Sequence, residues 1–220
     1  MKKTFAIVVC AAAMLLAGKA NAQLGINVGY APVTLSSTFT SGNTSTTSTT
    51  EMNGFFVGAT YNYGIQDNLG VAFGLDLRYN TKTTTTSSNL VVVSGSGKYH
   101  YTQLLFDVPV LINYSFPLGS EAKLTAFAGP AFSFAVSGNT HVTTTNTVAG
   151  ATSTSESDSD WYGNNSTNNR FDLTAALGVQ FQYSQFRLFG GYRLGLIDLD
   201  SDDNVKTTSA GLFVGLGFSL

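Results

Sequence analysis

The sequence has few of the residues on which soluble enzymes and disulfide-stabilised domains depend. It contains one cysteine, four prolines, one tryptophan and two histidines in 220 residues, and charged residues make up only 11% of it. The single cysteine, Cys10, lies in an apolar stretch near the N-terminus, so the rest of the chain cannot form disulfides or cysteine-ligated metal sites. No apolar run reaches the roughly 20 residues of a membrane-spanning helix, and helical hydrophobic spacing is not sustained anywhere.

The N-terminus has the three parts of a secretory signal peptide. The basic start MKK is followed by an apolar run at 5–17 and by the small-residue site Ala20-Asn21-Ala22. We therefore expect cleavage after Ala22, with a signal peptide at 1–22 and one domain at 23–220. Cleavage would leave eight basic and thirteen acidic residues, a net charge of −5, which argues against a nucleic-acid partner.

From Gln23 onward the hydrophobic period is two. In the clearest segment, 69–80, apolar residues such as Leu75 alternate with glycine or polar residues such as Asp76, which is typical of a strand with one oily and one polar face. Pro109 interrupts another strand and predicts a bulge there. Eight strands are predicted, at about 23–34, 52–63, 69–80, 99–114, 122–136, 169–183, 186–197 and 207–220.

Eight strands of this length indicate an all-β fold, an eight-stranded antiparallel up-and-down transmembrane β-barrel. The connections alternate between short ones, at 64–68, 115–121 and 184–185, and longer ones, at 35–51, 81–98, 137–168 and 198–206. Because bacterial barrels have short periplasmic turns, both termini are expected on the periplasmic side. A soluble barrel or sandwich is the alternative, but the polar faces carry mainly small residues, which suits a narrow lumen.

Aromatic residues support the same orientation. Those near the short connections are expected to form one interfacial girdle: Tyr61, Tyr63, Tyr114, Phe116, Tyr183, Phe186 and Phe218. A second, thinner girdle is expected at the other end: Tyr30, Phe55, Tyr79, Tyr99 and Phe171. The longer connections are rich in threonine, which favours strands, so some hairpins could project as ribbons whose edges recruit a partner strand.

Four segments resemble the eight-stranded outer-membrane β-barrel domain family, in particular its PorT-like branch and more distantly OmpX- and OmpA-type barrels. They are FDVPVLINYSF at 106–116, LTAFAGPAFSF at 124–134, FRLFGGYRLGL at 186–196 and GLFVGLGFSL at 211–220. The resemblance implies a cell outer membrane location and a final strand read by the barrel-assembly machinery through Gly215, Phe218 and Leu220. Leu220 departs from the family, which more often ends in Phe.

Charged residues on the polar faces are predicted to meet inside the barrel. We expect a lumen charge network of Asp76, Arg78, Asp107, Asp172 and Arg193, and further candidate lumen charges at Lys123, Arg170 and Arg187. Such a network either fills a narrow barrel or forms an ion path, and we favour the structural role. Bulky residues are also predicted to point inward and to oppose an open pore: Phe56, Leu111, Phe127, Phe189 and Phe213.

No catalytic, cofactor or metal site is predicted. The acidic segment 198–204 is dense in aspartate and could bind Ca²⁺, but it lacks the spacing of an EF-hand and is interpreted as a solvated loop. The histidines His100 and His141 raise the possibility of a rim hydrolase, which we do not favour.

We therefore predict a non-enzymatic outer-membrane barrel with a structural or adhesin-like role. Its expected partners are membrane lipid and lipopolysaccharide, the barrel-assembly machinery, and an extracellular protein or surface ligand. The alternatives are a narrow porin-like channel, a lipid-A-modifying enzyme and a soluble ligand-carrier barrel.

Overall fold

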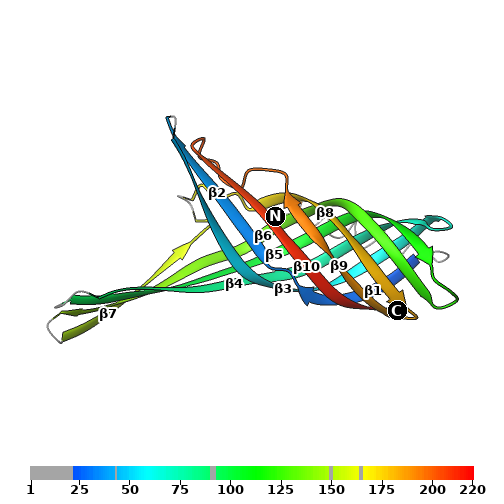
Figure 1. Ribbon diagram of the computed structural model, residues 1–220, viewed down its shortest axis with the longest axis horizontal. Coiled ribbons are helices and arrows are strands. Elements are labelled where there is room, and N and C mark those ends of the chain that lie inside the picture. Colours follow the sequence, from blue (N-terminus) through cyan, green and yellow to red (C-terminus); the bar gives the residue numbers. More distant parts are fainter. Residues whose placement is uncertain (1–21, 43, 90–92, 149–150, 164–165) are drawn as a thin grey trace.

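A computed structural model describes residues 22–42, 44–89, 93–148, 151–163 and 166–220 as one antiparallel sheet of ten strands (Figure 1). The strands are β1 (Ala22–Tyr30), β2 (Val33–Ser41), β3 (Thr44–Gln66), β4 (Leu69–Asn89), β5 (Val93–Pro117), β6 (Ala122–Val148), β7 (Ala151–Asp160), β8 (Phe171–Tyr183), β9 (Phe186–Gly195) and β10 (Val205–Ser219). The expected signal peptide lies outside the described residues except for Ala22. Within the described residues, no helix is long and apolar enough to cross a membrane.

The sheet closes on itself because β1 pairs with both β3 and β10. β1 and β2 are two halves of one wall strand, since both pair with β3 and β10 in an unchanged register across the interruption at Ala31-Pro32. Pro32 has no N–H to donate to either neighbour, which accounts for the interruption. β7 pairs only with β6, outside the ring. Because β1 and β2 count as one wall strand and β7 lies outside the ring, the ten strands form a barrel wall of eight. The predicted eight-stranded antiparallel barrel is confirmed.

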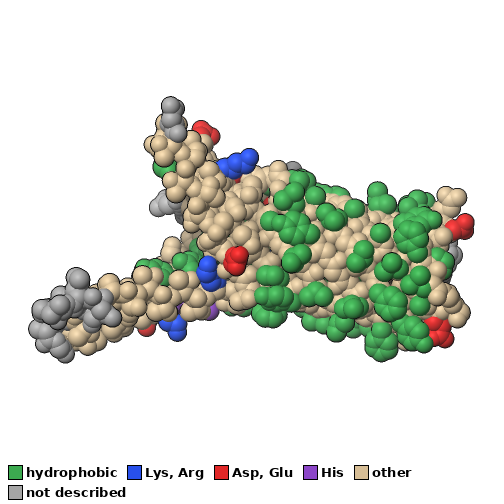
Figure 2. Space-filling view, viewed as in Figure 1, with side chains coloured by type: hydrophobic (Ala, Val, Ile, Leu, Met, Phe, Trp, Pro, Cys, Tyr) green, Lys and Arg blue, Asp and Glu red, His purple; other side chains and the backbone are tan. Residues whose placement is uncertain are grey.

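The outer surface of the barrel is apolar. Leu75, for example, is 47% exposed, while its neighbour on the other face, Asp76, is 6% exposed. Figure 2 shows green apolar side chains covering the barrel, whereas the parts that project from it are mostly tan. This inversion of a soluble protein's pattern is what a lipid-facing surface requires.

Aromatic rings lie at both ends of this surface. Near the short turns, Tyr114 packs on Phe116 and Phe186 packs on Phe218, with ring centroids 4.9 and 5.4 Å apart. At the other end, Tyr30 packs against Phe55 at 5.4 Å. The assignment of Tyr99 to the second girdle is wrong. Counting by twos along β5 from Asp107 places Tyr99 on the face that continues the lumen, where it stacks on Tyr101.

Two sheets project beyond the barrel wall at the end opposite the short turns (Figure 1). The three-strand arm consists of β2, the outer part of β3 (44–52) and the start of β10 (205–210). The four-strand arm consists of β7 and the outer parts of β4 (82–89), β5 (93–103) and β6 (138–148). Most of the predicted long connections are therefore strands rather than loops, because threonine and serine pair across neighbouring strands through backbone and hydroxyl groups.

The bulge predicted at Pro109 is not present. The register between β5 and β6 is the same at Pro109 as at Ile112, and it shifts instead between Leu104 and Leu105. Pro109 removes an N–H without adding a residue, and its ring occupies the space over Gly74, where an added Cβ would lie 2.6 Å from the proline Cγ. Opposite the actual bulge, Arg170 Nη1 donates to the carbonyl oxygens of Ala135 and Val136.

The orientation can be tested with a protease specific for glutamate. The chain has three glutamates, and all are exposed: Glu51 and Glu156 on the arms and Glu121 in a short turn. Because short turns face the periplasm, protease added to intact cells should cut at Glu51 or Glu156 and spare Glu121, as read from fragment masses. Protease added to lysed cells provides the control. Cleavage of intact cells at Glu121 alone would reverse the orientation.

Candidate functional site

The inward side chains form three layers along the barrel axis. Along β9, the order from the short-turn end is Arg187, Phe189, Gly191 and Arg193. Other strands add residues to these layers: Gln182 on β8 to the first, Phe213 on β10 to the second and Asp76 on β4 to the third. The lumen therefore has a polar layer near the periplasm, an aromatic layer in the middle and a charged layer toward the arms.

The aromatic layer consists of four inward phenylalanines that pack around buried Ala31: Phe56, Phe127, Phe189 and Phe213. Neighbouring ring centroids lie 6.2 to 6.5 Å apart. Each ring lies over a glycine of the wall. An added Cβ at Gly215 would be 2.5 Å from Phe189 Cζ, and one at Gly191 would be 2.7 Å from Phe213 Cζ. The four rings therefore point into the lumen, as predicted from the sequence, and they line the lumen cavity.

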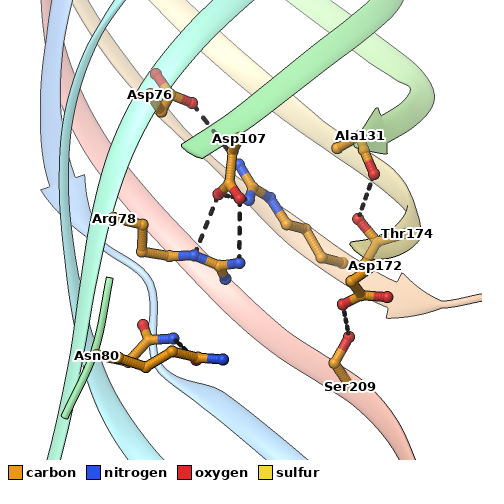
Figure 3. A network of polar contacts seen from close by, with 10 residues as sticks. Asp76, Arg78, Asn80, Asp107, Ala131, Asp172, Thr174 and Ser209 are labelled. Carbon is orange, nitrogen blue, oxygen red and sulfur yellow. Dashed lines mark hydrogen bonds and ion pairs between the residues drawn. The ribbon is translucent and has the colours of Figure 1, made fainter. Parts of the chain in front are cut away.

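The charged layer joins two arginines and two aspartates (Figure 3). Asp107 is fully buried and accepts contacts from both arginines: Arg193 Nη1 lies 2.6 Å from its Oδ2, and Arg78 Nε lies 3.1 Å from the same atom. Arg193 Nη2 also lies 3.8 Å from Asp76 Oδ2. We call these four residues the charge cluster. It has equal numbers of positive and negative groups, which is the condition under which buried charges are tolerated.

Asp172, the fifth member of the predicted network, lies beside the charge cluster and is not bridged to an arginine. Its Oδ2 accepts a hydrogen bond from Ser209 Oγ at 2.6 Å (Figure 3). Above the cluster, Asn80 donates to Gln103 and Gln103 donates to Tyr162 in the connection after β7. Burial raises the pKa of Tyr162, so its hydroxyl keeps its proton. Hydrogen bonds thus extend from the charged layer to the rim.

The three residues of the predicted assembly signal lie on β10 or directly after it. The Phe189 ring lies over Gly215, and Phe218 packs on Phe186. Leu220 is exposed, and its amide donates to the carbonyl of Leu24 at 2.8 Å, which joins the last residue to the first strand. Their recognition by the assembly machinery stays a prediction.

The histidines lie side by side on an open face of the four-strand arm, where His100 pairs with His141. His141 Nδ1 lies 2.7 Å from Asp158 Oδ1, and the Asp158 side chain is 80% exposed. The aspartates of 198–204 cap the backbone of their own loop: Asp198 accepts from Asp200 N, and Asp202 accepts from Asn204 N. Among the described residues, no group of three or more potential ligands is placed to hold a metal ion.

Sequence reasoning missed two structural features of the lumen and rim. The wall glycines over which the phenylalanine rings lie depend on which strands face each other across the barrel. A linear pattern does not reveal that arrangement. Arg170, predicted as a lumen charge, instead lies at the rim, where its guanidinium carbon is 4.9 Å from the centre of the Tyr162 ring. There it secures the connection after β7 to the bulge in β6.

The chain was compared with known proteins. Solved structures similar to this chain include the attachment invasion locus protein Ail of Yersinia pestis (15% identity, 91% of this chain and 100% of Ail, TM-score 0.37). Neisserial surface protein A is 16% identical over 89% of this chain and 97% of its own, with a TM-score of 0.35. The outer membrane protease OmpT of Escherichia coli is 8% identical over 91% of this chain and 97% of its own, also with a TM-score of 0.35. No curated protein matches the sequence.

The family assignment comes from the sequence itself. Residues 17–201 match the family described as "Outer membrane protein beta-barrel domain". That range contains every wall strand except β10, the whole four-strand arm and two strands of the three-strand arm. The predicted location in the outer membrane is therefore confirmed. The chain belongs to the outer membrane protein beta-barrel domain family.

Proposed function

We propose that this outer-membrane barrel is a non-enzymatic surface protein that binds an extracellular partner through its four-strand arm. The observation that carries the proposal is the four-strand arm, which ends at an edge strand. Among the described residues β7 pairs only with β6, and all ten residues of β7 are exposed. An exposed strand edge presents unpaired backbone donors and acceptors, which an extended segment of a partner can satisfy.

The chemistry of the arm supports a protein partner. On β7, Glu156, Asp158 and Asp160 alternate with serines, so the acidic side chains share one face of the arm. These charges keep the edge soluble and favour a partner segment with basic residues. Contact with lipopolysaccharide and recognition by the barrel-assembly machinery belong to the same proposal, as consequences of an outer-membrane location.

The proposal is tested by shortening the four-strand arm without touching the barrel. Val142 pairs with Ser157 and Thr84 pairs with Tyr99, so replacing residues 143–156 and 85–98 each by Asn-Gly leaves two short hairpins. Cells that carry this variant should attach to a surface coated with extracellular protein no better than cells without the protein. Replacing 39–46 in the three-strand arm provides the matched control, because Thr38 pairs with Thr47. Undiminished attachment, with the variant still heat-modifiable on a gel, would contradict the proposal.

The main alternative, a narrow channel, is tested by conductance. An eight-stranded barrel is just wide enough for its own side chains, and here four phenylalanines and the charge cluster occupy the lumen. We expect purified protein in planar bilayers to give little or no steady conductance, with a known porin as the positive control. A reproducible conductance of porin size would favour the channel.

A further inference from the structure

The polar layer of the lumen contains a row of basic and amide side chains at one level. Lys123 on β6 pairs with Gln182 on β8, and Gln182 pairs with Arg187 on β9. All three alternate with outward apolar residues and therefore point inward. Two positive charges thus lie on three adjacent strands near the short-turn end, on either side of a glutamine. We call these residues the basic row.

Arg187 is buried without a carboxylate partner. It is 7% exposed, and its Nη2 donates to Asn27 Oδ1 at 3.0 Å and to the carbonyl oxygen of Phe218 at 3.5 Å. No aspartate or glutamate of the described residues lies within 4.0 Å of it, and its Nε has no hydrogen-bond partner there. All thirteen acidic residues of the chain are among the described ones. Arg78 and Arg193, by contrast, both have aspartate partners.

The wall is shaped around this unpaired guanidinium. An added Cβ at Gly217 would lie 3.0 Å from Arg187 Nε, and one at Gly25 would overlap the guanidinium itself. Two glycines of adjacent strands therefore make room for the group. A buried cation is costly unless an anion or ordered water compensates its charge. Because the wall leaves room for the Arg187 guanidinium and no carboxylate of the chain pairs with it, we infer that a group outside the chain compensates this charge.

A cavity brings solvent to the basic row. Arg187 and Gln182 line a lumen cavity of about 90 Å³, and Lys123 lines a wider recess of about 600 Å³ at the short-turn end. The two share Gln23, Asn62 and Asn113 as lining residues, so they adjoin each other. The recess has one acidic lining residue, Asp67, in the turn between β3 and β4. The cavity has one as well. Asp76 lines it only at the charged layer, where it lies 3.8 Å from Arg193.

We propose that the basic row binds a small soluble oxyanion of the phosphate class, which enters from the short-turn side. Guanidinium, ammonium and amide N–H groups are the donors that hold phosphate and carboxylate oxygens. The barrel wall separates the row from lipid headgroups, so the ligand is a solute and not a lipid. This site is at the opposite end of the barrel from the arms and does not depend on their function.

The test is calorimetric titration of the purified, folded protein in a neutral, phosphate-free detergent. Inorganic phosphate at constant ionic strength should bind saturably, one per chain. Arg187→Gln should raise the apparent Kd for phosphate by about tenfold or more, since it removes a buried charge-assisted donor. Lys206→Gln is the matched control, because it makes a similar change at an exposed residue of the three-strand arm and should leave the Kd unchanged.

A second variant protects the test against loss of folding. If Arg187→Gln does not fold, Lys123→Gln, at a half-buried position, should still weaken phosphate binding while the protein remains heat-modifiable. Absence of saturable binding to the wild-type protein would overturn the proposal. So would an equal loss of affinity in Lys123→Gln and Lys206→Gln, because that would mean non-specific attraction to positive charge.

Discussion

Replacing Leu75 by arginine is expected to destabilise the folded barrel by about 2 to 4 kcal/mol, because the new charge would face hydrocarbon near the middle of the bilayer. Leu75 lies on β4, between the turn at 67–68 and the rim, and its side chain is 47% exposed on the lipid-facing surface. The free energy of unfolding in lipid vesicles, measured by urea titration and far-UV circular dichroism, gives the loss directly.

Leu118→Arg provides a matched control. Leu118 is 58% exposed and lies in the turn between β5 and β6. Because the short turns of such barrels lie on the periplasmic side of the membrane, an arginine there is expected to reach water. The same substitution there should change the free energy of unfolding by no more than about 0.5 kcal/mol. Equal losses at the two positions would mean that the apolar surface does not lie in a membrane.

The facing of the wall strands could be predicted because the side-chain period of a strand is two. Once Leu75 and Asp76 are placed on opposite faces, every other residue of β4 follows, and the same holds for the inward phenylalanines such as Phe127. The length of the strands could not be predicted in this way. The arms contain few apolar residues, so no hydrophobic alternation marks them, and their threonines indicate strand only through a weak propensity.

The contents of the lumen could be predicted only in part. Asp76 and Asp107 occupy equivalent positions on neighbouring strands, and the register pairs them directly. Contacts across the barrel depend on the stagger of the closed sheet, which the linear pattern does not contain. For this reason the sequence predicts Asp172 as a member of the network although its partner is Ser209. The sequence likewise does not reveal that the Phe189 ring lies over Gly215.

Arg193→Ala is expected to cost about 3 to 5 kcal/mol, the largest effect of any substitution considered, because it breaks a buried ion pair from one side. Arg193 contacts Asp107 at 2.6 Å and Asp76 at 3.8 Å. Its removal leaves Asp76 without a cation within 4.0 Å among the described residues, and leaves Asp107 with Arg78 alone. Urea unfolding of the variant should show this loss as a lower midpoint.

A charge-balanced double variant separates pairing from simple loss of packing. Arg193→Met with Asp76→Asn removes one charge of each sign and keeps the pair of Arg78 and Asp107, so it should recover much of the stability that Arg193→Ala loses. If the single variant were as stable as Lys206→Ala on the exposed arm, the charge cluster would be solvated and would not brace the lumen. The wild-type protein could also pass a small current that Arg193→Ala abolishes without unfolding the barrel. In that case the charge cluster would control the passage of ions, because a cluster that only stabilises the barrel would leave no path for them.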